Sequence, residues 1–230
     1  MEPHEYHKMY SLEESNWWYL GRADLIHELL DEYKPSFDSI LDIGCGTGSI
    51  LGKYSGKRRV GIEQNAIAVE YAKGRGLTVH DSLDKVHEKF DVILMMDVLE
   101  HVENDHAFLQ NALTRLNEDG VLILTVPAFQ WLWSHHDELV HHYRRYSKPM
   151  VKKVVEQSGG KCLHASYWNA SFFAPAFLKK KVFSSDESDL SPVHPTLNKV
   201  LLSMLKLENR ASMRIPAPLG TSVYAVVKKK

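Results

Sequence analysis

Residues 41–48, with the sequence Leu-Asp-Ile-Gly-Cys-Gly-Thr-Gly, decide the fold of this 230-residue chain. An apolar run at 39–43, predicted to be a β-strand, leads directly into these glycines, and a helix is expected to follow. Glycines let the backbone turn tightly and let a ligand approach it closely. In an open parallel sheet, ligands bind where such a strand ends. The stretch therefore predicts a ligand site in an α/β protein.

The spacing of the glycines disfavours a dinucleotide pyrophosphate as the ligand. The fingerprint G-x-G-x-x-G needs a glycine where this chain has Ser49, and the third glycine here is Gly48. Glu63 lies 21 residues after Asp42, at the end of the predicted strand 59–63. A carboxylate there accepts hydrogen bonds from both hydroxyls of a ribose. The sequence therefore favours a nucleoside ligand and keeps an NAD(P)-dependent oxidoreductase as an alternative.

Strands and helices alternate along the chain after residue 39. This order predicts βαβ units, which form a parallel sheet with helices on both faces. The predicted strands are 39–43, 59–63, 77–80, 90–96, 121–126, 162–168 and 221–227, and the predicted helices are 23–33, 66–75, 105–116, 149–158 and 197–207.

These segments together resemble the class I S-adenosylmethionine-dependent methyltransferases. The resemblance covers roughly residues 17–168, through the glycine stretch, Glu63, the segment 80–82, the block 90–102 and the turn at 116–122. It implies a Rossmann-like, seven-stranded, mostly parallel sheet with the last strand antiparallel. It also implies S-adenosyl-L-methionine as cofactor, with S-adenosyl-L-homocysteine as product. The expected cofactor-binding residues are Arg22, Asp42, Gly44, Cys45, Gly46, Gly48, Glu63, Gln64, Asp81, Ser82 and Asp97.

An aromatic segment precedes the first strand. Its residues 17–22, WWYLGR, resemble a segment that lies over the cofactor in one methyltransferase subgroup. Trp18 is expected near the acceptor, and Arg22 can pair with the cofactor's carboxylate. The alternative is a helix that packs its aromatic rings on the sheet and leaves Arg22 in solvent.

A histidine-rich loop at 134–147 follows the predicted fifth strand, where the family places substrate contacts. Its pattern resembles a subgroup of small-molecule methyltransferases, although His141 stands where that subgroup usually has glycine. The expected acceptor-binding residues are therefore Trp18, Asp137, Arg144, Arg145 and Tyr146.

Three interpretations of this loop stay open. His101 or His142 acts as a general base, or Arg144 and Arg145 pair with acids and only hold the loop. In the third, His135, Asp137 and one of His141 and His142 bind a metal, but their spacing is weak, and no metal is predicted.

The segment 170–183 combines aromatic residues with three adjacent lysines and is expected to be a lid or a dimer contact over the acceptor pocket. Pro175 interrupts any amphipathic helix there, so stable membrane association is not expected. The predicted division is a helical cap at 1–36, a cofactor-binding core at 37–168, an insertion or lid at 169–210 and a final core strand within 211–230.

Composition limits the class of protein. The 28 basic and 29 acidic residues give a net charge of −1, which offers no attraction for nucleic acid. Cys45 and Cys162 are expected to be free thiols, and with no leader recognised we expect a cytoplasmic protein.

The sequence as a whole predicts a methyltransferase that acts on an oxygen or nitrogen atom of a small acceptor. The acceptor is anionic or hydrophobic, and the protein can be a monomer or a homodimer. The alternatives are the oxidoreductase and a non-catalytic S-adenosylmethionine-binding protein.

Overall fold

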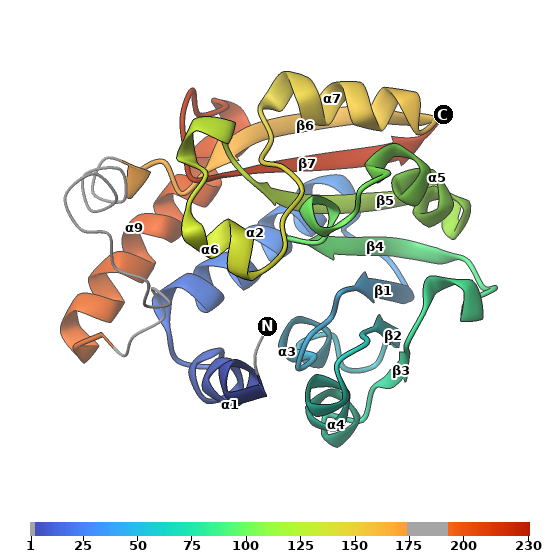
Figure 1. Ribbon diagram of the computed structural model, residues 1–230, viewed down its shortest axis with the longest axis horizontal. Helices are drawn as coiled ribbons and strands as arrows, with labels where there is room; N and C mark the ends of the chain where they lie inside the picture. Colours follow the sequence, from blue (N-terminus) through green and yellow to red (C-terminus); the bar gives the residue numbers. More distant parts are fainter. Residues whose placement is uncertain (1–2, 174–192) are drawn as a thin grey trace.

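The computed structural model describes residues 3–173 and 193–230. Seven strands form one sheet in the order β3-β2-β1-β4-β5-β7-β6 (Figure 1). β1 to β5 are parallel, and β7 is antiparallel to both β5 and β6, as the resemblance implied. The strands are β1 Ser39–Ile43, β2 Arg58–Ile62, β3 Thr78–His80, β4 Phe90–Met96, β5 Leu116–Pro127, β6 Gly160–Trp168 and β7 Ser222–Lys229.

Helices cover both faces of the sheet, and each face has its own buried core. One core joins the sheet to α5 and α7, and the other joins it to α2 and α9. Both cores consist mainly of buried aliphatic side chains, with a few aromatic rings among them, and their burial is the main favourable contribution to folding. The helices are α1 Pro3–Leu12, α2 Trp17–Tyr33, α3 Ser49–Gly52, α4 Ala66–Gly74, α5 Asp105–Thr114, α6 His135–Leu139, α7 Lys148–Gln157 and α9 Pro195–Arg214, with short 3₁₀ turns η1 Leu83–Lys85, η2 Leu99–His101 and η3 Gln130–Leu132.

The packing of α2 against α9 holds the N-terminal part of the chain on the sheet. A Cβ atom on Gly21 would lie 2.2 Å from Cδ2 of Leu205, so only glycine allows the two helices to pack this closely. Buried Asn209 of α9 accepts a hydrogen bond from Nε1 of Trp168 and donates to the Gly21 carbonyl. α9 therefore links α2 to β6, at the edge of the sheet.

Several boundaries differ from the sequence-based prediction. α2 begins at Trp17, because the Asn16 side chain caps it, so the aromatic segment belongs to the same helix as 23–33. β5 begins at Leu116, which is fully buried and pairs with Phe90. α9 extends to Arg214. Residues 174–192 lie outside the described residues, and they include most of the segment 170–183 that was expected to be a lid or a dimer contact.

Among the described residues, no helix combines the length and apolar character needed to cross a membrane.

Candidate active site

The glycine turn after β1 adopts a backbone conformation that other residues rarely take. Gly44 and Gly48 have φ angles of +77° and +79°. A Cβ atom on Gly44 would lie 2.5 Å from Cγ2 of Val98, so the turn also packs too tightly for a side chain. Glycine at these positions therefore avoids backbone strain, and at Gly44 also a clash with Val98. Contact of this backbone with a ligand stays a prediction.

Glu63 follows β2 directly, and its side chain contacts the glycine turn. Its carboxylate accepts hydrogen bonds from the backbone N–H groups of Gly46, at 3.0 Å, and of Gln64 and Asn65, both at 2.8 Å. The side chain is half-buried, whereas that of Gln64 is exposed. The carboxylate is thus fixed beside the bare backbone of the glycine turn, where a ribose is expected.

Asp42 and Arg22 bring two unpartnered polar atoms to the same edge of the sheet. Asp42 is 2% exposed, and its Oδ1 atom has no hydrogen-bond partner. Burial, and then repulsion from Glu63, raise the pKa of Asp42 to about 7, although Arg22 acts against the rise. The Nε atom of Arg22 is also buried without a partner.

The orientation of Arg22 is set by Asp97 and Trp18. Nη1 of Arg22 donates to Oδ2 of Asp97 at 3.2 Å, and the guanidinium lies 4.6 Å from the centre of the Trp18 ring. Asp97 has a positive φ of 54°, and Thr125 holds it through a hydrogen bond to Oδ1. The free carboxylate oxygen of Asp42 and the free Nε of Arg22 suit the ammonium and carboxylate groups of an amino-acid moiety. The residues present therefore fit the expected cofactor.

Asp81 and Ser82 lie at the end of β3, with neither side chain turned into a buried site. Asp81 is exposed and accepts a hydrogen bond from Lys85 at 2.7 Å, which lowers the pKa of its carboxyl group. Ser82 caps η1. Their contact with adenine stays a prediction.

The Cys45 thiol points into the protein core. A Cβ atom on Gly61 would lie 2.4 Å from its sulfur, and burial raises the pKa of the thiol. Only the Cys45 backbone can therefore face a ligand. Cys45 and Cys162 are both free.

Helix α1, which belongs to the segment 1–36 expected to form a helical cap, lies against the glycine turn. Cε of Met9 lies 3.1 Å from the position of a Cβ atom on Gly46. Burial, and then the charge of Glu63, raise the pKa of Tyr6 to about 12. Immediately after α1, Glu13 pairs with Arg75 and accepts a hydrogen bond from Thr47. These contacts place an aromatic and apolar cover over the turn.

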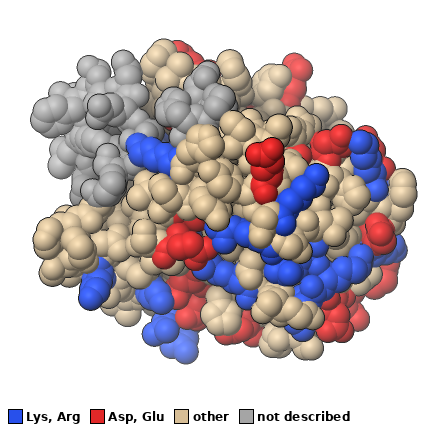
Figure 2. Space-filling view, turned by 90° about the horizontal axis from the view of Figure 1, so that it is seen from below, with Lys and Arg blue, Asp and Glu red and all other residues tan. Residues whose placement is uncertain are grey.

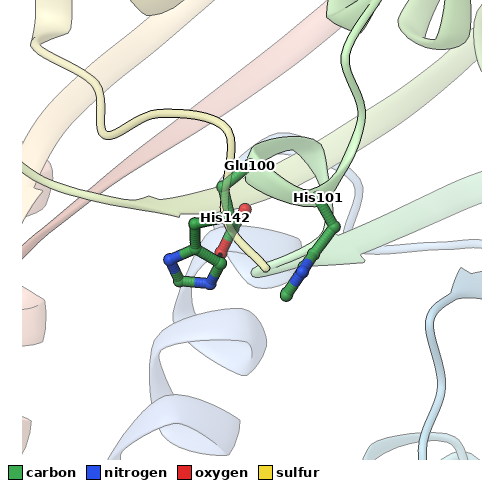
Figure 3. Close-up of side chains that lie close together, drawn as sticks. All are labelled: Glu100, His101 and His142. Carbon is green, nitrogen blue, oxygen red and sulfur yellow. Dashed lines mark ion pairs between the residues drawn. The ribbon is translucent and has the colours of Figure 1, made fainter. Parts of the chain in front are cut away.

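Glu100, His101 and His142 form a second cluster, at the end of β4. Glu100 and His101 belong to η2, and His142 follows α6 (Figure 3). The rings of the two histidines meet edge to face, with their centres 4.6 Å apart. Burial, and then the neighbouring His142, lower the pKa of His101 to about 4. The structure thus brings together the two histidines that the sequence suggested as bases.

The sequence-based prediction did not include Glu100 among the site residues. Its side chain is 1% exposed, and Oε2 has no partner. Burial, and then the charge of Asp97, raise the pKa of this carboxyl group well above its ordinary value. Glu100 lies in the sequence between Asp97 and His101, two predicted site residues, and this position could have identified it as a site residue.

The loop 134–147 is held together by hydrogen bonds to Asp137 and is joined to α5 through Asp105. Asp137 is completely buried and accepts hydrogen bonds from Ser134, from Nδ1 of His142 at 2.8 Å and from Nε and Nη2 of Arg145. These bonds from His142 and Arg145 lower the pKa of Asp137 although burial opposes them. Arg144 and Tyr146 both contact Asp105. Since all four predicted acceptor-binding residues of this loop have partners within the protein, their direct contact with an acceptor stays a prediction.

A surface cavity of about 530 Å³ opens beside the histidines. Its lining includes His101, His142, Trp133 and Tyr143, so aromatic and polar surfaces face the same space. A small organic molecule fits a cavity of this size and character.

Comparisons with known proteins agree on one family. Residues 19–174 match the family model described as a methyltransferase domain. The chain is 38% identical over 104 residues to the ubiquinone biosynthesis O-methyltransferase of Glaesserella parasuis, covering 37% of this chain and 44% of that protein. It is 35% identical over 140 residues to the protein of the same name from Haemophilus ducreyi, covering 48% and 59%. The chain thus spans less than half the length of the first of these relatives.

Solved structures share the fold. A S-adenosylmethionine-dependent methyltransferase from Clostridium acetobutylicum superposes with a TM-score of 0.59 at 14% identity, covering 90% of both chains. One from Archaeoglobus fulgidus gives 0.55 at 20% identity, covering 90% of this chain and 94% of that one.

Proposed function

The chain belongs to the class I S-adenosylmethionine-dependent methyltransferases, and we propose that it methylates an oxygen atom of a small-molecule acceptor. The observation that carries the proposal is the placement of two sites at one sheet edge. The unpartnered atoms belong to Asp42, near the end of β1, and to Arg22, in the second turn of α2. The cavity beside His101 and His142 opens near the end of β4. The relatives from Glaesserella parasuis and Haemophilus ducreyi are O-methyltransferases, which supports oxygen over nitrogen.

The cofactor-binding residues have separable roles. Arg22 and Asp42 bind the carboxylate and ammonium groups of the amino-acid moiety, and Glu63 accepts hydrogen bonds from the ribose hydroxyls. The bare backbone of the glycine turn allows close approach, and α1 excludes water. When bound, S-adenosyl-L-methionine supplies an electrophilic methyl group on its sulfonium.

The acceptor site has to align a nucleophile and remove its proton. The cavity beside His101 and His142 orients the acceptor. When no metal ion is bound beside it, Nε2 of His142 takes the proton of the acceptor hydroxyl group. Nδ1 of the same ring donates a hydrogen bond to Asp137, which fixes the tautomer. Arg145 holds Asp137 through two hydrogen bonds, so Asp137 and Arg145 are positioning residues.

The partners proposed are limited to small molecules. On the face shown in Figure 2, basic side chains gather across the middle of the view with acidic side chains around them. The net charge of the chain is −1, which does not favour nucleic acid. The cytoplasmic location and the homodimer stay predictions.

The test is formation of S-adenosyl-L-homocysteine from S-adenosyl-L-methionine with a panel of phenols, aliphatic alcohols and amines. We expect turnover with hydroxyl compounds and a loss of at least about 100-fold in kcat/KM for His142→Gln. His136→Gln, an exposed residue of α6, is the matched control and should retain activity. Turnover with amines alone, or full activity of His142→Gln, would contradict the proposal.

A further inference from the structure

Three metal-binding side chains converge at the acceptor end of the site. Glu100, His101 and His142 each offer one ligand atom, and these atoms all lie within 4.8 Å of one another. Figure 3 shows the three side chains close together, with Glu100 and His101 on η2 and His142 in the loop after α6. We propose that these three residues bind a divalent transition-metal cation, such as Zn²⁺ or Mn²⁺, that contacts the acceptor. Two imidazoles and one carboxylate with open positions are an established ligand set for such ions.

The burial of Glu100 is the first argument. Its side chain is 1% exposed and Oε2 has no hydrogen-bond partner. Two other carboxylates, Asp97 and Asp137, act on it electrostatically, and both have partners of their own. A buried carboxyl group with an unsatisfied oxygen costs free energy, and a bound cation would lower that cost.

The separation of the donor atoms is the second argument. Nε2 of His142 lies 3.9 Å from Oε1 of Glu100, which is too long for a hydrogen bond. With bonds of about 2.0–2.2 Å, two ligands of one tetrahedral ion lie roughly 3.3–3.5 Å apart. A side-chain adjustment on the order of 1 Å would therefore bring the three atoms to ligand spacing.

The second coordination shell is already in place. Nδ1 of His142 contacts Oδ1 of Asp137 at 2.8 Å, and Arg145 fixes that carboxylate. Metal-binding histidines typically use their second ring nitrogen in this way, which orients the first nitrogen toward the ion.

The open side of the cluster is the cavity that also includes Trp133 and Tyr143. An acceptor oxygen that enters there completes the coordination, and the cation lowers the pKa of its hydroxyl group. The proton leaves to solvent through the cavity. The oxygen then forms its bond to the methyl carbon as the sulfur–carbon bond breaks. The role in methyl transfer rests on the proposed function, whereas the binding of the cation does not.

The experiment measures cation binding directly. The full chain, stripped with chelator, is titrated with Zn²⁺ and with Mn²⁺ by calorimetry, and with Co²⁺ by visible absorption. We expect one site per chain. Glu100→Gln and His142→Gln, both close in shape to the native side chains, should each weaken binding by at least about 100-fold, and Asp137→Asn by about 10- to 100-fold. Circular dichroism checks that each variant folds.

The matched controls are two exposed histidines of α6 that do not line the cavity. They are His135 and His136. His135→Gln and His136→Gln should leave the affinity for the cation unchanged. Absence of stoichiometric binding, or binding that is lost in these controls and kept in Glu100→Gln, overturns the inference. Methyl transfer that persists in chelator would then leave the proposed function standing.

Discussion

Cofactor binding should depend on pH through Asp42. The free protein holds this carboxyl group in a fully buried position with one unpartnered oxygen, and its pKa rises from 3.8 to about 7. The ammonium group of the cofactor favours the ionised carboxylate. Binding therefore has to displace a proton from Asp42 whenever the pH lies below about 7.

The size of the effect follows from this pKa. Near pH 6 roughly a tenth of the free protein has an ionised Asp42, and near pH 8 roughly nine-tenths. Affinity for S-adenosyl-L-homocysteine should therefore rise about 10-fold between these values, which is about 1.4 kcal/mol. One proton per chain should be released on binding near pH 6 and almost none near pH 8.

The assay is calorimetric titration with S-adenosyl-L-homocysteine at several pH values, repeated in buffers of different ionisation enthalpy. Asp42→Asn should bind more weakly at every pH, and its affinity should lose the 10-fold rise. Asp84→Asn, an exposed residue of η1, controls for a general charge effect. A flat affinity profile with no proton release in the native chain would refute the reasoning.

Three further changes test the framework around the site. Gly44→Ala should lower the free energy of unfolding by about 2–3 kcal/mol in urea titration, because its φ is positive and Val98 lies against the new methyl group; an unchanged midpoint would mean that the turn relaxes. Arg145→Met should cost about 3 kcal/mol in the same measurement, since it leaves the buried Asp137 carboxylate without its cation; a neutral effect would contradict this account of the loop. Burial opposes the shift at Asp91, but hydrogen bonds from Asp38, Asn117 and Ser39 outweigh it and lower its pKa to about 2. That stabilisation is complete above pH 4 and is lost as the pH falls toward 2, so Asp91→Asn should flatten the acid limb of thermal unfolding; an acid limb identical to that of the native chain would exclude the role of Asp91.

Local patterns predicted the sheet and the cofactor half of the site. The glycine turn and the acids after β1 and β2 are encoded in adjacent residues, since parallel strands bring their carboxyl ends to one edge. The positive φ of Gly44 agrees with the turn expected there, whereas the hydrogen bonds from backbone N–H groups to Glu63 were not predicted. The strand boundary at Leu116 was missed because pairing with Phe90 extends β5 beyond the apolar run.

The acceptor half depends on contacts between distant segments, which spacing does not reveal. Asp137 lies far from η2 in the sequence, yet it orients His142 beside Glu100. Likewise, nothing local to Met9 indicates that it lies against Gly46. A charged residue in a loop could pair with many other residues of the chain, and only the tertiary packing determines which ion pairs and hydrogen bonds form.

The identity of the cofactor is the central claim, and one titration tests it most directly. The native chain is titrated with S-adenosyl-L-methionine, S-adenosyl-L-homocysteine and NAD, beside Glu63→Gln and the exposed control Glu70→Gln. The account predicts binding of the first two ligands, no binding of NAD, a loss of at least about 10-fold in Glu63→Gln and full affinity in Glu70→Gln. Tighter binding of NAD, or unchanged affinity in Glu63→Gln, would contradict it.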